Sequence, residues 1–191
     1  MNNPLRILQT LDRHLARPTE ITLFGRAALA LGYPGSPAAF TATHDVDAIL
    51  PLSWLLAQDE NLDFWDAQQR TNIELESEGL YLTHLFRELE VILTPDWLSC
   101  RVKIPIELRH LTVFRPATID LILTKMARGD ENDLIDIEFL LSKESLTANQ
   151  LHAAFARARV PDIPEIQALF LTAQSKVMDL AKLQESRPPF L

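Results

Sequence analysis

The sequence predicts an α/β protein of the α+β type, in which a small mixed β-sheet is flanked by helices and followed by a helical C-terminal portion. Up to about residue 115, short apolar runs alternate with segments of helical periodicity, whereas beyond that point only the helical periodicity continues. A chain of 191 residues suffices for one core and an appendage rather than two full domains. We therefore expect a core over residues 1–115 and a helical portion over residues 116–191 that packs on it.

The first elements follow from periodicity and from the positions of glycine and proline. Leucines at helical spacing predict an amphipathic helix over residues 4–16, which ends before Pro18. An apolar strand over residues 21–24 runs into Gly25, and the Ala- and Leu-rich residues after it favour a helix up to residue 31. Residues 33–42 hold two prolines and predict a loop, after which residues 45–50 form a second strand.

Composition patterns place the remaining elements. Two helices are expected over residues 53–57 and 62–75. Short apolar or alternating runs predict strands over residues 80–86, 89–93, 100–104 and 111–114. Four more helices are expected over residues 116–127, 131–141, 148–158 and 164–183, the third of them capped by Thr147. Residues 186–191 are expected to be disordered.

Charge and composition exclude several classes of protein. The net charge of −8 argues against a general nucleic-acid binder, because such binding depends on Lys and Arg neutralising phosphates. No membrane-spanning apolar run and no signal peptide is visible, and a single cysteine fits a cytoplasmic protein. Residues 58–96 hold 10 acidic and 2 basic side chains, whereas residues 101–128 hold 6 basic and 2 acidic ones. This asymmetry indicates either a cleft that takes metal and phosphate or two solvated faces.

Asp45 and Asp47 are the first candidate site residues. They stand two apart on a predicted strand, so their side chains leave the same face and can converge on one cation. Two hard carboxylates suit Mg²⁺, which completes its coordination with water and substrate phosphates. The alternative is an acidic pair that only faces water.

Gly25 is the second candidate, because it stands where a strand turns into a helix. Backbone N–H groups and the positive end of the helix at such a turn can face an anion such as a phosphate. The alternative is a glycine required for a positive φ angle or for close packing. The five histidines have no zinc-ligand spacing, but His84 alternates with apolar neighbours and is a candidate to line the same cleft.

These motifs resemble those of the nucleotidyltransferase superfamily, the DNA polymerase beta-like fold, and in particular its small bacterial AbiEii-like branch, which includes toxins of toxin–antitoxin systems. Residues 25–29, Gly-Arg-Ala-Ala-Leu, are similar to the first motif of the family, except that Arg26 replaces a second small residue. The second motif, a Thr or Ser before Asp-x-Asp, is matched by Thr43 with the two aspartates. A later helical signature is matched by Asp120, Lys125, Asp133 and Asp136.

The resemblance implies metal-dependent transfer of a nucleotide from an NTP to an acceptor hydroxyl on RNA, protein or a small molecule. It implies Mg²⁺ or Mn²⁺ on the two aspartates, and Gly25, Arg26 and Thr43 at the nucleotide. Lys125 would meet a phosphate or the developing charge, and its alternative is a helix-surface lysine. A third metal-binding carboxylate is expected on an adjacent strand, with Glu90 the first candidate and Glu88 the second, unless they face solvent.

Two kinds of function remain open at this stage. One is an active nucleotidyltransferase with catalytic Asp45, Asp47 and Lys125. The other is a catalytically inactive binding module of the same fold, for instance with a cognate antitoxin or regulator, which Arg26 and the uncertain third acid favour. Asp133 and Asp136 are either part of the site or an ion-paired brace near Lys125.

Overall fold

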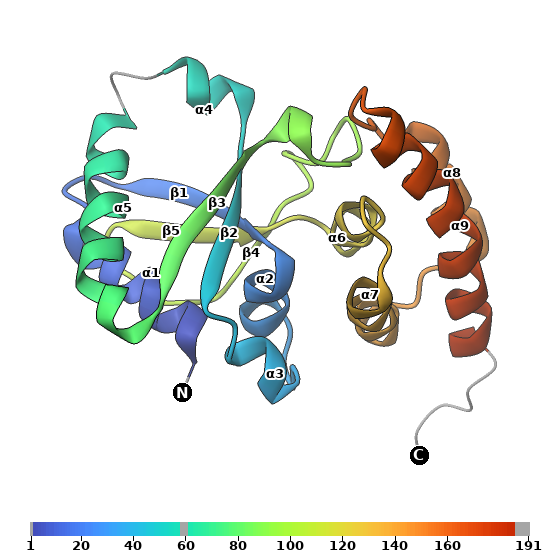
Figure 1. The fold of residues 1–191 in the computed structure, drawn as a ribbon, viewed down its shortest axis with the longest axis horizontal. Helices are drawn as coiled ribbons and strands as arrows, with labels where there is room; N and C mark the ends of the chain where they lie inside the picture. The colour runs from blue at the N-terminus through green and yellow to red at the C-terminus, as the bar shows by residue number, and fades with distance from the viewer. Residues whose placement is uncertain (1, 58–60, 186–191) are drawn as a thin grey trace. The chain divides into compact units, whose positions relative to one another are not determined.

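The computed structural model describes residues 2–57 and 61–185 (Figure 1). The predicted disorder of residues 186–191 lies outside this described part. The chain divides into two compact units, of which the first comprises Met1–Glu88 and Cys100–Pro116 and the second comprises Leu89–Ser99 and Ala117–Leu191. The chain therefore enters the second unit twice, first for residues 89–99 and finally from Ala117.

A five-stranded mixed sheet forms the centre of the first unit. Its strands are β1 (Thr19–Phe24), β2 (Asp45–Leu50), β3 (Tyr81–Arg87), β4 (Val102–Lys103) and β5 (Leu111–Arg115). They lie in the order β3-β2-β1-β5-β4, in which β1 runs antiparallel to β2 and parallel to β5. The pair β2–β3 is parallel and the pair β4–β5 is antiparallel. The predicted fold class, with a small mixed sheet, is thus confirmed.

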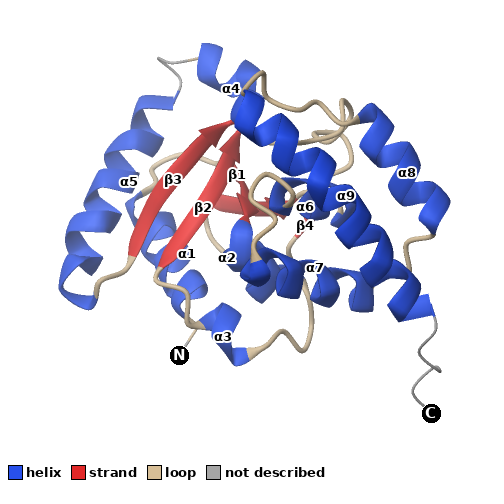
Figure 2. Ribbon diagram, turned by 45° about the vertical axis from the view of Figure 1, so that its right-hand side comes forward, coloured by secondary structure: helices blue, strands red, loops and turns tan. Residues whose placement is uncertain are grey.

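The described part of the first unit also contains five α-helices, of which the first, second and fifth pack on the sheet and the third packs on the second (Figure 2). They are α1 (Asn3–His14), α2 (Gly25–Gly32), α3 (Ala38–Thr41), α4 (Leu52–Leu56) and α5 (Leu62–Leu75), with a 3-10 turn over Glu76–Glu78. Helix α1 begins where the side chain of Asn2 accepts a hydrogen bond from the backbone of Leu5, and its apolar residues Ile7, Leu8 and Leu11 are fully buried. Among the α-helices of this unit, α3 was not predicted and lies in the predicted loop, because four residues are too few to show a helical period.

Asp12 fastens α1 to the start of β5. Its carboxylate accepts backbone N–H bonds from Arg109, His110 and Leu111 at 3.0, 2.7 and 2.8 Å. Burial acts to raise the pKa of Asp12, but these three hydrogen bonds to the charged form outweigh it and hold the pKa below its ordinary value. The ionised carboxylate therefore holds the start of β5 against α1.

The strand predicted over residues 89–93 is wrong. Residues Glu88–Glu90 form a 3-10 helix, η3, and the chain then makes a single antiparallel bridge between Leu93 and Arg159. Arg159 N donates to Leu93 O at 2.8 Å, and Leu93 N donates to Arg159 O at 3.4 Å. The segment pairs through one bridge with a residue 66 positions later in the chain, and local periodicity cannot reveal such a distant partner.

The described part of the second unit contains four α-helices. They are α6 (Thr118–Lys125), α7 (Glu131–Lys143), α8 (Ala148–Arg157) and α9 (Pro164–Glu185), close to the predicted ranges. Helix α8 begins with a capping box in which Thr147 and Gln150 exchange side-chain and backbone hydrogen bonds, as the predicted cap requires. Within the described residues, none of the helices combines the length and the apolar character needed to cross a bilayer.

Candidate metal and nucleotide site

Asp45 and Asp47 leave the same face of β2, as their spacing predicted. Val46 and Ala48 point to the opposite side and are fully buried, whereas both aspartates are half-buried. Strand β2 is bordered by β1 and β3, so residues of both neighbours lie beside the aspartates. The pair therefore stands on an interior strand of the sheet rather than at its edge.

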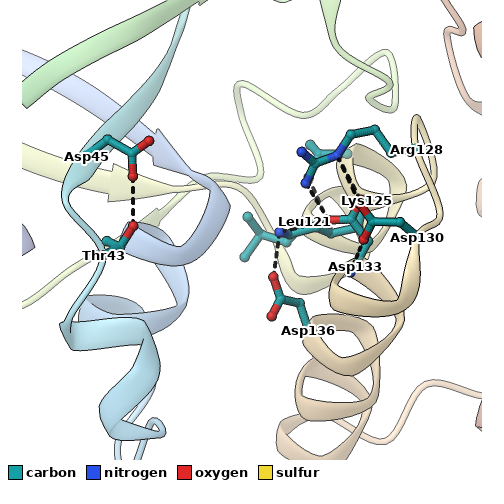
Figure 3. A network of polar contacts seen from close by, with 9 residues as sticks. Thr43, Asp45, Leu121, Lys125, Arg128, Asp130, Asp133 and Asp136 are labelled. Atoms are coloured by element: carbon teal, nitrogen blue, oxygen red, sulfur yellow. Dashed lines mark hydrogen bonds and ion pairs between the residues drawn. The ribbon is translucent and has the colours of Figure 1, made fainter.

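Thr43 orients the first aspartate. Thr43 stands two residues before the start of β2, and its hydroxyl donates a hydrogen bond of 2.7 Å to Asp45 Oδ1 (Figure 3). A hydrogen bond of this kind fixes the rotamer of a carboxylate and leaves its second oxygen available to a ligand. The nucleotide-binding role predicted for Thr43 stays a prediction, but its contact with Asp45 is a role that the motif alone did not specify.

Gly25 approaches Asp47 closely. It follows β1 directly and opens α2, with a φ angle of +64°, and its neighbour Phe24 pairs with Asp47 across the β1–β2 ladder. A Cβ atom on Gly25 would stand 3.0 Å from Asp47 Oδ2. Both structural reasons for a glycine therefore hold here, and they bring the first turn of α2 against the carboxylate.

His84 on β3 completes the cluster. Its Nδ1 atom lies 2.9 Å from Asp47 Oδ1 and 3.2 Å from Thr83 Oγ1. Asp45, Asp47 and His84 each offer a ligand atom, and these three atoms lie within 4.8 Å of one another. The sequence marked His84 only as a residue of the same cleft and did not assign it to the metal.

The third carboxylate is not where it was expected. Glu90 was predicted on a strand beside the two aspartates, but it lies in η3, at the start of the segment that belongs to the second unit. Glu88, the second candidate, accepts a 3.1 Å hydrogen bond from the backbone N of Leu52 at the start of α4. The strand parallel to β2 is β3, and the titratable side chain that it brings to Asp47 is His84.

Arg26, the residue that departs from the family motif, is half-buried in the first turn of α2. Its guanidinium lies over the ring of Phe40 in α3, with 5.7 Å between Cζ and the ring centroid. This cation–π contact places the guanidinium of Arg26 against α3. The nucleotide-binding role of Arg26 stays a prediction.

The later helical signature forms a buried ionic cluster inside the second unit (Figure 3). Lys125 Nζ donates to Asp133 Oδ1 at 3.2 Å and to Asp136 Oδ2 at 2.6 Å, and both aspartate side chains are 1% exposed. Arg128 donates twice to the carboxylate of Asp133, at 3.0 Å each. The ion-paired brace considered for Asp133 and Asp136 is therefore present, while the catalytic role of Lys125 stays a prediction.

Asp120 is also enclosed within the second unit. Its Oδ1 atom accepts hydrogen bonds from the backbone and hydroxyl of Thr94 at 2.7 and 2.9 Å, while its Oδ2 atom is buried without a hydrogen-bond partner. Burial raises the pKa of Asp120 above its ordinary value, and the two bonds from Thr94 oppose it only in part. Asp120 therefore serves the packing of its own unit, where it joins α6 to the segment Leu89–Ser99.

The donor set on the sheet fits a divalent cation. Two carboxylates and one imidazole converge from adjacent strands. The two carboxylates carry like charges, and a cation between them offsets their repulsion. The glycine-opened helix beside them adds backbone N–H groups, which attract anions. The arrangement thus combines groups for a cation with groups for a phosphate.

A mixed sheet that carries paired aspartates next to a glycine-opened helix is the architecture of a nucleotidyltransferase-type protein. The chain belongs to the family described as "Nucleotidyltransferase of unknown function (DUF6036)", whose sequence profile matches residues 5–168. Comparisons with curated proteins and with solved structures find no match. The resemblance to nucleotidyltransferases is confirmed, and the AbiEii-like branch stays a prediction.

Proposed function

We propose that the protein is a divalent-metal-dependent nucleotidyltransferase, which transfers a nucleotide from an NTP to an acceptor hydroxyl. The observation that carries the proposal is the convergence of Asp45, Asp47 and His84 within 4.8 Å, beside Gly25. Family membership supports the class of reaction. The acceptor is RNA, protein or a small molecule.

Each side chain then has a definite task. Asp45 and Asp47 hold Mg²⁺ or Mn²⁺, and Thr43 keeps the carboxylate of Asp45 in one orientation. A bound cation of this kind neutralises phosphate charge and lowers the pKa of the attacking hydroxyl. Gly25 lets the first N–H groups of α2 stand next to Asp47, so that phosphate oxygens can meet both the cation and the backbone.

We also propose that Lys125, in the second unit, binds a phosphate. An ammonium group has three N–H donors, and the contacts to Asp133 and Asp136 use two of them. The remaining donor is the one that we assign to a phosphate oxygen. The hydrogen bonds to the two buried aspartates fix the position of the ammonium group.

The test of this proposal is an assay of nucleotide transfer. The purified protein is incubated with Mg²⁺ or Mn²⁺ and each labelled NTP in the presence of total RNA or protein. A labelled product is expected with the wild-type protein and is expected to disappear in Asp45→Asn. Glu107→Gln, which changes an exposed acid of the same unit, is the matched control and retains the product.

A second candidate is an inactive binding module of the same fold, within a toxin–antitoxin pair of the AbiEii-like type. Arg26 in the glycine motif and a histidine in the place of a third carboxylate favour it. This candidate requires that Asp45→Asn leaves partner binding and any growth phenotype unchanged. The transferase requires that the same substitution abolishes the phenotype while the protein stays folded.

A further inference from the structure

An irregularity in the sheet aims His84 at Asp47. In an unbroken ladder after the pairs Asp45–Tyr81 and Val46–Leu82, Ala48 would pair with His84, but the observed partner of Ala48 is Leu85. One extra residue is therefore inserted in β3, and Thr83 and His84 together stand opposite Asp47. β-bulges of this kind redirect a side chain next to functional sites.

Neighbouring rings hold the imidazole at this position. The ring of His84 stacks on Phe86 with 5.9 Å between centroids and 25° between planes, and Phe86 in turn meets the edge of Phe24 at 5.2 Å. The side chain of His84 is 60% exposed, so it reaches Asp47 from the solvent side. Its place is therefore set by the bulge and the rings rather than by burial.

The spacing of the donor atoms suits a metal ion. His84 Nδ1 and Asp47 Oδ1 are 2.9 Å apart. Neighbouring ligand atoms of an octahedral ion with bonds of about 2.1 Å are separated by about 3 Å, which is the edge of the octahedron. Asp45 offers an oxygen within the same 4.8 Å group.

We propose that His84 is the third protein ligand of this site and that it makes the site prefer Mn²⁺ to Mg²⁺. The inference rests on the proposed function, which requires a cation on Asp45 and Asp47. Mg²⁺ is a hard ion that selects oxygen ligands, whereas imidazole nitrogen binds first-row transition metals better. Mn²⁺ accepts imidazole and also suits carboxylates and phosphates, so a set of two carboxylates and one imidazole favours it.

The experiment measures coordination directly and without a nucleotide. Mn²⁺ is added to the full chain, and pulsed electron paramagnetic resonance detects whether a ¹⁴N nucleus is coupled to the bound ion. Affinities for Mn²⁺ and Mg²⁺ are measured by calorimetry on the wild-type protein, on His84→Asp and on His152→Gln. His152 is an exposed histidine of α8 in the other unit, and its substitution is the matched control.

We expect ¹⁴N coupling in the wild-type protein and in His152→Gln, and none in His84→Asp. The ratio of the Mn²⁺ affinity to the Mg²⁺ affinity is expected to fall by about tenfold or more in His84→Asp, because a third carboxylate replaces the nitrogen. Circular dichroism verifies that each variant is folded.

The outcomes separate the two proposals. If Mn²⁺ binds and Asp45→Asn abolishes that binding, yet no ¹⁴N coupling is seen in the wild-type protein, the role of His84 is overturned while the proposed function stands. The same holds if the affinity ratio is unchanged in His84→Asp, since His84 then makes only a hydrogen bond to Asp47. If neither ion binds the wild-type protein, both proposals are overturned.

Discussion

Asp47 Oδ2 occupies the space that a side chain on Gly25 would need, so the position of this carboxylate depends on a glycine at residue 25. The 3.0 Å separation between that oxygen and an added Cβ is shorter than an ordinary van der Waals contact. The contact links the anion-attracting end of α2 to one of the carboxylates of the candidate metal site. A methyl group at residue 25 therefore tests whether metal binding by Asp47 depends on the close approach of α2.

Gly25→Ala is expected to destabilise the protein and to weaken metal binding. The φ angle of +64° costs a residue with a side chain about 1–2 kcal/mol, and the new methyl group displaces the carboxylate of Asp47. Gly79→Ala is the matched control, since Gly79 has a φ angle of +66° but its nearest neighbour would be 3.9 Å from the new Cβ. Denaturant unfolding and Mn²⁺ calorimetry should show similar losses of stability in both variants, and a loss of metal binding only in Gly25→Ala.

Thr43→Val is expected to reduce metal affinity without a large effect on stability. Valine has the shape of threonine but lacks the hydroxyl that donates to Asp45 Oδ1. Removal of such an orienting partner typically lowers metal affinity by about tenfold or more. Thr41→Val, which removes a hydroxyl that donates to the backbone of Ala38, serves as the comparison. Equal Mn²⁺ affinities of the two variants would contradict an orienting role for Thr43.

Lys125→Met is expected to destabilise the second unit strongly. The substitution leaves the carboxylates of Asp133 and Asp136 buried without the ammonium that joins them, and breaking a buried ion pair in this way costs about 3–5 kcal/mol. Lys182→Met is the control, because that side chain is 66% exposed in its ion pair with Asp179, and it should change stability by less than about 1 kcal/mol. The measurement is the free energy of unfolding in urea, and similar values for the two variants would show that the cluster contributes little.

Asp12→Asn is expected to change how stability depends on pH. The folded-state pKa of Asp12 lies below its ordinary value of 3.8, so its contribution is fully present above that value and is lost as the pH falls through the folded-state pKa. Hydrogen bonds to a charged group contribute about 1.5–3 kcal/mol each, and the amide of asparagine replaces one acceptor by a donor. Urea unfolding at a series of pH values should give a loss in Asp12→Asn that is constant near neutral pH and shrinks below about pH 4. A loss that is independent of pH down to pH 2 would contradict the role of the ionised carboxylate.

Local pattern was enough to predict much of the fold and one half of the candidate site. The strand over residues 45–50 was predicted with its observed bounds, and the turn from β1 through Gly25 into α2 was predicted as well. Both follow from features within a few residues, namely alternation of side chains, a glycine at a turn and a run of helix formers. The common face of Asp45 and Asp47 follows in the same way from the period of a strand.

The sequence by itself determined which residues can act as metal ligands and that Asp45 and Asp47 share one face of their strand, because propensity and periodicity are local properties. Only the tertiary structure decided which of the candidate side chains lie next to one another. The bulge in β3 that turns His84 toward Asp47, the bridge of Leu93 to Arg159 in place of a strand with Glu90, and the enclosure of Lys125 by two aspartates all depend on pairing between distant segments. Such pairings are selected by the packing of the whole unit, in which one inserted residue changes which side chain faces a given partner.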